Sequence, residues 1–208
     1  GAAWLYKLFN PKIKFILNLQ EGKNLERQGF LINLFRKMII KRVDTVVAIS
    51  NYLANYARKI NSKANILVIP NGVNLNKFKI QDSTRLSDGQ EFKNDEKIII
   101  SVSRLVTKNG LEDLIDACYK LAIRQVQDPE FIEGQAISYK LLIIGDGPLE
   151  EILKLKVKNL GLENKVSIVG GVSHDQVPEY LNNADVFVRP SLSEGLGTAF
   201  LEAMACVV

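Results

Sequence analysis

With 208 residues, 47% of them hydrophobic, the chain is long enough to bury the core of one large domain or of two small ones. It has no apolar run of the roughly 18 residues that a membrane-spanning helix requires, and we expect a soluble, cytoplasmic protein without a secretory signal. One histidine and two distant cysteines, Cys118 and Cys206, exclude a metal cluster and predict buried thiols in a reducing compartment.

The net charge of +4 conceals two oppositely charged parts. Residues 1–80 contain 14 Lys and Arg against 3 Asp and Glu, a balance of +11, whereas residues 81–208 contain 13 against 20, a balance of −7. A basic part can bind nucleic acid, an anionic membrane surface or an acidic ligand, and it can equally be a solvated face. No aromatic or groove-reading motif accompanies it, so we expect no nucleic acid among the partners.

In chain order, the first part alternates apolar runs typical of strands with amphipathic stretches typical of helices. The expected strands are 13–19, 45–49 and 66–69, and the expected helices are 25–42, with a basic C-terminal end, and one that Ser50 caps. Residues 74–96 lose this periodicity and become polar. We therefore assign residues 1–80 to a first domain and residues 81–96 to a linker.

The remaining residues, 97–208, repeat the alternation and form the second expected domain. Its strands are expected at 97–103, 139–144, 166–169 and 185–188, and its helices at 110–126, from Pro148, near 176–181 after a Ser173-x-x-Gln176 capping box, and from Thr198. Strands that alternate with helices predict a parallel sheet covered on both faces. The predicted fold class is therefore α/β, with two Rossmann-like domains facing across a cleft that holds the ligand.

The stretch SLSEGLGTAFLEAMA, near the C-terminal end, has the pattern of a strand exit, a glycine-rich turn and a helix start at Thr198. Gly195 and Gly197 let the backbone approach a ligand, and the unpaired amides of a helix start form an anion site. Glu202 lies roughly 6 Å further along the helix axis, about the reach from a diphosphate to a ribose diol, and Glu194 precedes the helix. A turn of this kind is also common without any ligand.

A second candidate site follows the strand expected at 97–103. Arg104 can hold a diphosphate with its bidentate fork, and Lys108 can add a mobile point charge. Two surface cations in an ordinary strand-to-helix loop would give the same pattern. His174, just before another expected helix, is most simply a surface residue.

Taken together, these stretches resemble the group-1 (family 4) retaining, nucleotide-sugar-dependent glycosyltransferases. SLSEGLGTAFLEAMA is similar to the family's Glu-x7-Glu motif, and residues 103–110 are similar to its Gly/Ser-Arg-Leu-x-x-x-Lys-Gly loop. IPNGVN at 69–74 and GDGPL at 145–149 resemble two further family segments. The resemblance covers residues 13–204 and implies the GT-B fold, with both domains incomplete in this chain and the chain inactive by itself.

The resemblance implies a hexosyltransferase that moves a sugar from a nucleoside diphosphate donor to a glycan or lipid-linked acceptor, with retention and without a cofactor. Glu194 is the implied catalytic residue, in contact with the donor sugar, and Glu202 would hold the ribose. The implied donor-binding residues are Arg104, Lys108, Gly171, Val172, Gly195, Leu196, Gly197, Thr198 and Glu202. The first domain would carry the acceptor surface, and its basic helix end could rest on the inner face of the membrane.

Several positions depart from the family pattern. Asn109 occupies the usual lysine position, with Lys108 one place earlier, and Gln20 stands where many members carry a histidine. Its neighbour Glu21 then becomes a candidate polar contact, and the turn residues Asn71 and Gly72 complete this set of cleft residues. No Asp-x-Asp pair is present to hold a metal-bridged diphosphate, so cations and a helix N-terminus would stabilise the leaving group. A nucleotide-sugar-binding module or partner subunit without transfer activity is the alternative function.

Overall fold

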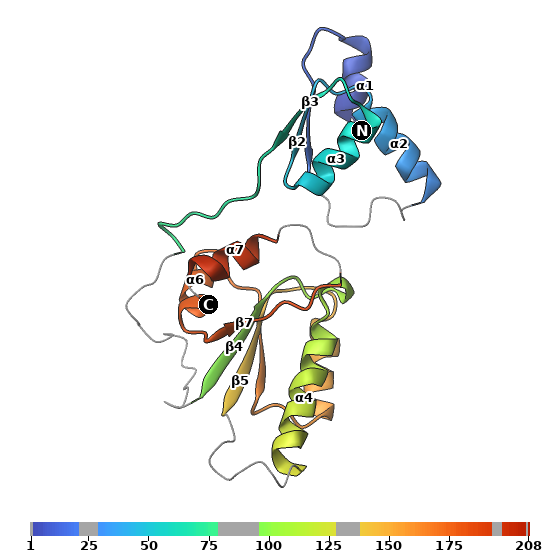
Figure 1. Cartoon of the computed structure of the whole chain (residues 1–208). Helices are drawn as coiled ribbons and strands as arrows, with labels where there is room; N and C mark the ends of the chain where they lie inside the picture. Colours follow the sequence, from blue (N-terminus) through green and yellow to red (C-terminus); the bar gives the residue numbers. More distant parts are fainter. Residues whose placement is uncertain (1, 21–28, 79–95, 128–137, 193–196, 207) are drawn as a thin grey trace. The chain divides into compact units, whose positions relative to one another are not determined.

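The computed structural model describes residues 2–20, 29–78, 96–127, 138–192, 197–206 and 208, which divide into two compact α/β units (Figure 1). The first unit comprises the described residues up to Gly72, together with Gly197. The second comprises those in the ranges 73–192 and 198–208. Within the described ranges, no helix is both long enough and apolar enough to cross a bilayer.

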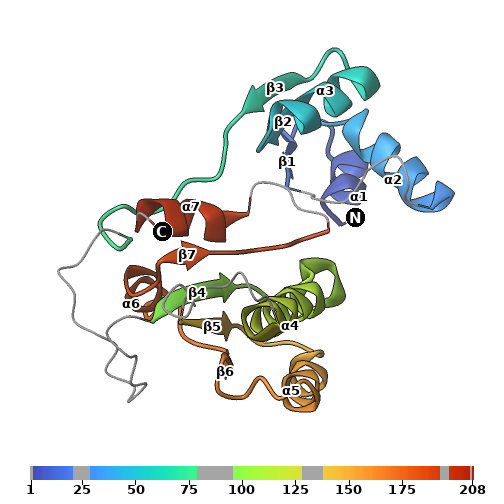
Figure 2. The same ribbon diagram turned by 60° about the horizontal axis from the view of Figure 1, so that its bottom comes forward.

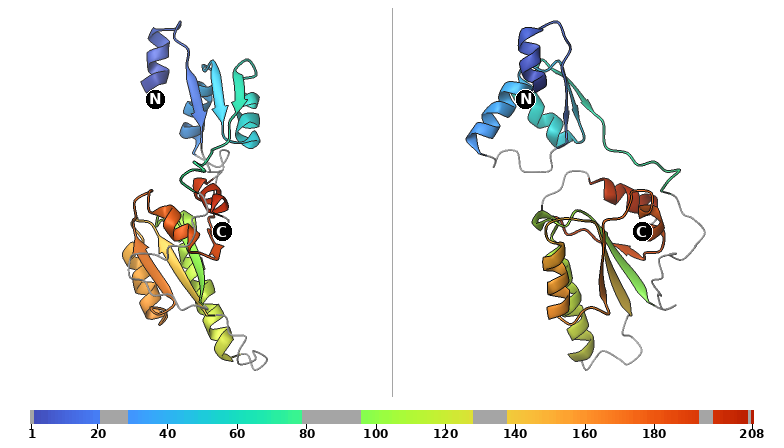
Figure 3. Two further views of the ribbon diagram at one scale, coloured as in Figure 1. Left: turned by 90° about the vertical axis from the view of Figure 1, so that its left-hand side faces the viewer. Right: turned by 180° about the vertical axis from the view of Figure 1, so that it is seen from behind.

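The first unit contains a three-stranded parallel sheet with helices α2 and α3 on one face (Figure 3). Its strands lie in the order β1-β2-β3, and Ile40, Val46 and Leu53 form part of the core beneath the helices. The Ser50 hydroxyl accepts a hydrogen bond from the Leu53 amide at 3.4 Å, which confirms the predicted cap. The elements are α1 (Ala2–Phe9), β1 (Ile16–Leu19), α2 (Phe30–Ile40), β2 (Thr45–Ala48), α3 (Asn51–Ile60) and β3 (Asn65–Val68).

The second unit contains a four-stranded parallel sheet in the order β6-β5-β4-β7 (Figure 2). Its elements are β4 (Lys97–Val102), the 3₁₀ turn η2 (Thr107–Asn109), α4 (Leu111–Gln127), β5 (Tyr139–Ile144), α5 (Glu150–Asn159), β6 (Val166–Gly170), α6 (Val177–Asn182), β7 (Val186–Phe187) and α7 (Thr198–Ala205). All four strands had been predicted from their apolar runs.

Helices cover both faces of this second sheet. Successive residues of a strand point to opposite faces, and β5 shows the consequence. Leu141 and Ile143 pack in one core with α4 and α5, whereas Leu142 and Ile144 pack in another with α6 and α7. This explains why residues 141–144 of the strand are apolar without interruption, as expected for a parallel sheet that is buried on both faces.

Two local expectations need correction, and one helix was not expected. Helix α5 begins at Glu150 rather than at Pro148, and the amide of its N-cap residue Leu149 donates to the Leu105 carbonyl at 3.1 Å, in the loop after β4. The expected Ser173-x-x-Gln176 box forms only in part, with the Gln176 side-chain oxygen accepting from the amide and the hydroxyl of Ser173. Helix α1 is not predicted by the sequence pattern.

The second unit begins earlier in the chain than the assigned domain boundary at residue 80. Phe78 is only 1% exposed and packs with Ile98, Leu142 and Ala203 in the core below α6 and α7. Residues 73–78 therefore belong with the second unit, although the sequence analysis had assigned them to the first domain. Residues 81–95 of the expected linker lie outside the described residues.

Both cysteines are buried and free, as the sequence predicted. Burial raises the pKa of the Cys118 thiol and of the Cys206 thiol, which disfavours the reactive thiolate.

Candidate functional site

A pocket of about 380 Å³ opens at the carboxyl ends of the strands in the second unit. Loops that leave β4, β5 and β6 form its floor, and the first turns of α7 form one wall. This is the place where open parallel sheets bind ligands, because the strand exits and the helix N-termini converge there. The pocket is lined by Val102, Ser103, Arg104, Ile144, Gly145, Asp146, Gly171, Val172, His174, Val177, Arg189, Thr198, Ala199 and Glu202.

Five of the residues expected to bind a donor line this pocket together. They come from three separate segments of the sequence: the loop after β4, the exit of β6 and the start of α7. They are Arg104, Gly171, Val172, Thr198 and Glu202.

Helix α7 begins at Thr198, as predicted, and presents Thr198 and Glu202 to the same pocket. The two residues are four apart, so they lie on one face of the helix about 6 Å apart along its axis. Thr198 is exposed at the N-terminus, where unpaired amides favour an anion, whereas the Glu202 side chain is 12% exposed. The wall therefore offers an anion site next to a single buried carboxylate.

The loop after β4 is held against the exit of β5 by the backbone. The Ser103 amide donates to the Ile144 carbonyl at 3.0 Å, and the Leu105 amide donates to the Asp146 carbonyl at 2.7 Å. Gly145 permits this approach: its φ is +136°, and a Cβ there would lie 2.0 Å from the Ser103 carbonyl oxygen. The GDGP sequence thus fixes the position of the loop that carries Arg104, and it also contributes Asp146 to the pocket lining.

Asn109 stabilises the loop by a hydrogen bond and does not line the pocket. The residue is only 1% exposed, and its side-chain amide nitrogen donates to the Arg104 carbonyl at 2.6 Å. Lys108 is exposed and is absent from the pocket lining, while its carbonyl accepts from the Leu192 amide at 2.8 Å. A lysine at position 109 would bury its ammonium group, so the packing of this loop disfavours a cation at that position.

The other expected site residues lie elsewhere or are not described. Gly197 is buried directly before α7, and Gln20, Asn71 and Gly72 belong to the first unit. Gln20 lines a separate, mainly apolar pocket of about 400 Å³ between β1 and α2. Glu21, Glu194, Gly195 and Leu196 fall outside the described residues.

Four polar residues of the pocket wall were not predicted from the sequence: Ser103, Asp146, His174 and Arg189. His174, interpreted as a surface residue, has a 63% exposed side chain but contacts the Glu202 carboxylate at 2.9 Å. Arg189 lies two residues after β7 and directly after the strand expected at 185–188, so the strand-exit rule that identified Arg104 could have found it. Ser103 is 9% exposed, and its buried hydroxyl has no hydrogen-bond partner within the described ranges.

Comparison with known protein families gives two matches that together span most of the chain. The family model described as glycosyl transferases group 1 matches residues 82–208, and the model described as glycosyltransferase family 4 matches residues 9–77. The division between the two matches falls near the start of the second unit.

Two curated bacterial enzymes illustrate the likeness in sequence. Mannosylfructose-phosphate synthase of Agrobacterium fabrum is 31% identical over 181 residues, which cover 86% of this chain and 38% of the enzyme. The GDP-mannose-dependent alpha-(1-6)-phosphatidylinositol monomannoside mannosyltransferase of Mycobacterium tuberculosis is 28% identical over 185 residues, covering 83% of this chain and 45% of the enzyme. The chain thus spans less than half the length of either relative.

Among solved structures, the Anabaena protein HepE in complex with UDP and glucose superimposes with a TM-score of 0.71. It shares 23% sequence identity, and the match covers 95% of this chain and 52% of HepE. At this identity the likeness establishes the fold. It confirms the predicted fold class, Rossmann-like α/β units of the GT-B type.

Proposed function

Because the chain belongs to the glycosyl transferases group 1 family, we propose that it binds a nucleoside diphosphate sugar in the pocket of its second unit and takes part in transferring the sugar to an acceptor with retention of configuration. In this proposal Arg104 and the N-terminus of α7 bind the diphosphate, and Glu202 accepts hydrogen bonds from the ribose hydroxyls. Gly171 and Val172 contact the nucleobase, and Glu194 contacts the donor sugar.

One observation carries the proposal: Arg104, Thr198 and Glu202 line one pocket at the carboxyl edge of a parallel sheet. A guanidinium and a helix N-terminus both stabilise the negative charge of a diphosphate, and a carboxylate accepts hydrogen bonds from two hydroxyls. The names of the relatives agree, since one is GDP-mannose-dependent and another was solved with UDP. The acceptor proposed for this family member is a glycan or a lipid-linked glycan.

Glu202→Gln tests the ribose role. We expect this variant to bind uridine or guanosine diphosphate about tenfold more weakly, because a charge-assisted hydrogen bond contributes about 1.5–3 kcal/mol. It should also lose the preference of the wild-type chain for ribose over 2′-deoxyribose. Calorimetric titration of each nucleoside diphosphate and of its 2′-deoxy form into wild type and variant measures the two effects.

Glu151→Gln is the matched control, because it removes the same charge from an exposed side chain on α5, away from the pocket lining. Equal affinities for wild type and Glu202→Gln would contradict the ribose assignment. Nucleotide-sugar turnover by the full-length protein then separates a transferase from a binding module, which would bind the donor without releasing nucleoside diphosphate.

We also propose that helix α2 contacts an anionic membrane surface, which suits a lipid-linked acceptor. Phe30 and Leu31 on this helix are 79% and 65% exposed, and Lys37 and Lys41 are exposed near its C-terminal end. Each cation near such a surface contributes about 1 kcal/mol, so Lys37→Gln with Lys41→Gln should reduce binding to vesicles that contain phosphatidylglycerol roughly 30-fold. Sedimentation with neutral and anionic vesicles measures this.

The control for the membrane proposal is Lys154→Gln with Lys158→Gln, which neutralises two exposed lysines on α5 of the second unit. This pair should bind vesicles as the wild type does. If the wild-type chain binds anionic and neutral vesicles equally, the membrane proposal fails and a soluble acceptor is favoured.

A further inference from the structure

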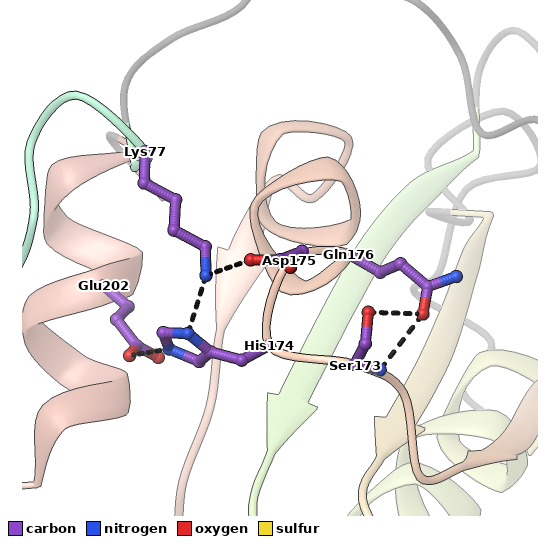
Figure 4. Close-up of polar contacts among 6 residues, drawn as sticks. All are labelled: Lys77, Ser173, His174, Asp175, Gln176 and Glu202. Atoms are coloured by element: carbon purple, nitrogen blue, oxygen red, sulfur yellow. Dashed lines mark hydrogen bonds and ion pairs between the residues drawn. The ribbon is translucent and has the colours of Figure 1, made fainter.

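His174, in the loop between β6 and α6, lies between a lysine and the proposed ribose carboxylate (Figure 4). Its Nε2 is 2.9 Å from Glu202 Oε1, and its Nδ1 is 2.8 Å from Lys77 Nζ. The ring also packs against Phe78, with the ring centroids 5.3 Å apart. All four residues belong to the second unit, so the cluster does not depend on how the two units are placed.

The two contacts of the ring determine which nitrogen carries the proton. An ammonium group has three donors and no acceptor, so Lys77 donates to Nδ1, which must be unprotonated. In the neutral imidazole the proton is then on Nε2, which donates to the Glu202 carboxylate. Lys77 thereby selects the tautomer in which His174 can hold Glu202.

Lys77 is itself held from two sides. Its Nζ lies 2.6 Å from Asp175 Oδ1, and its backbone amide donates to the Asn74 carbonyl at 3.0 Å. The Lys77 ammonium lowers the pKa of Asp175, so this carboxylate stays charged and keeps the cation beside the ring. The side chain of Asp175 is 90% exposed, whereas that of Lys77 is 27% exposed.

Glu202 needs such support because a carboxylate that accepts two ribose hydroxyls must turn both oxygens toward the sugar. Each carboxylate oxygen has two acceptor positions, so Oε1 can accept from His174 and from a hydroxyl at the same time. We propose that His174 is a positioning residue that orients Glu202 for the ribose, and that Lys77 acts through the tautomer of His174. This inference rests on the proposed donor site and extends it to two residues outside the family motifs quoted above.

Two variants of His174 with opposite properties test the inference. His174→Gln keeps an N–H donor of similar reach but loses the ring, whereas His174→Phe keeps a ring against Phe78 but loses the donor. We expect His174→Phe to bind the ribonucleoside diphosphate about fivefold more weakly, with little change for the 2′-deoxy analogue. His174→Gln should retain most of the ribose preference. Titration of uridine and guanosine diphosphates and their 2′-deoxy forms measures both ratios.

The lysine provides a second, independent arm of the test. Lys77→Met removes the donor to Nδ1 and should reduce the ribose preference by about twofold, because the ring then samples both tautomers. Lys154→Met is the matched control, since Lys154 pairs with Glu150 and Glu151 on the surface of α5. It should leave the preference unchanged.

The outcomes separate this inference from the function on which it rests. If the wild-type chain shows no ribose preference, the role of Glu202 fails, and the inference fails with it. If the preference exists and disappears in Glu202→Gln but survives in His174→Phe, only the inference is overturned. If the ribose preference is lost in His174→Gln but retained in His174→Phe, the role of His174 is to pack against Phe78 and not to donate to Glu202. Unfolding midpoints of all variants check that the second unit remains folded.

Discussion

Replacing Arg104 with alanine should weaken the binding of a nucleoside diphosphate about ten- to hundredfold, because a bidentate, charge-assisted contact to phosphate contributes about 1.5–3 kcal/mol. Binding of the bare nucleoside should hardly change, since it has no negatively charged phosphate for the guanidinium to bind. Arg104 lines the pocket, and its carbonyl is tied to Asn109, so the loop should keep its form in the variant. Titrations of uridine and uridine diphosphate, and of the guanosine pair, measure the difference.

Two further substitutions sharpen the Arg104 prediction. Lys108→Ala should cost about threefold or less, because Lys108 is exposed and does not line the pocket. Arg58→Ala, on α3 of the first unit, removes the same type of cation and should have no effect on the nucleotide. If Arg104→Ala weakened nucleoside and nucleoside diphosphate equally, Arg104 would not bind the diphosphate.

The largest expected loss of stability comes from Gly145→Ala. A Cβ at this position would lie 2.0 Å from the Ser103 carbonyl oxygen, and the backbone has a φ of +136°, which side chains rarely allow. Because the contact is with backbone, the loop after β4 would have to move, at a cost of at least about 3 kcal/mol. We expect the second unit to unfold roughly 10 °C or more below the wild type in a thermal scan.

Gly161→Ala separates the steric contact from the backbone conformation. Gly161 has a φ of +65° and nothing within 4 Å of an added Cβ, so only the left-handed backbone opposes the substitution. Its cost should be about 1–2 kcal/mol. Equal stabilities for the two variants would show that the loop after β4 moves at little cost in free energy to accommodate the added Cβ. Gly145 would then not fix the position of Arg104.

Much of the pocket could be predicted because it follows from local rules. The strands were recognisable as apolar runs, and parallel strands bring their exits to one edge, which placed Arg104 and Gly171 together. The spacing of Thr198 and Glu202 needs only the geometry of one helix. Residues of this kind are found without knowing any contact between distant parts of the chain.

The features that sequence reasoning missed depend on such distant contacts. Nothing near His174 in the sequence indicates that Lys77 and Glu202 lie beside it. Phe78 follows a polar turn and was assigned to the first domain, yet it packs in the core of the second unit below α6 and α7. Asn109 resembles a displaced binding residue, and only its burial in the loop reveals its hydrogen bond to Arg104.

The two cores of the second unit differ in when they can form during synthesis. The buried residues of the core under α4 and α5 lie between Leu105 and Val166, so most of this core can close while later residues are still being added, although the partly buried Ile168 and Val188 also pack against it. The core under α6 and α7 must wait, because it joins Phe78 to residues as late as Cys206. Until then one apolar face of the nascent sheet is uncovered and prone to aggregate. Since α7 also carries Thr198 and Glu202, we expect nucleotide binding to appear only at the last stage of folding, and a nucleotide present during refolding should trap the finished unit.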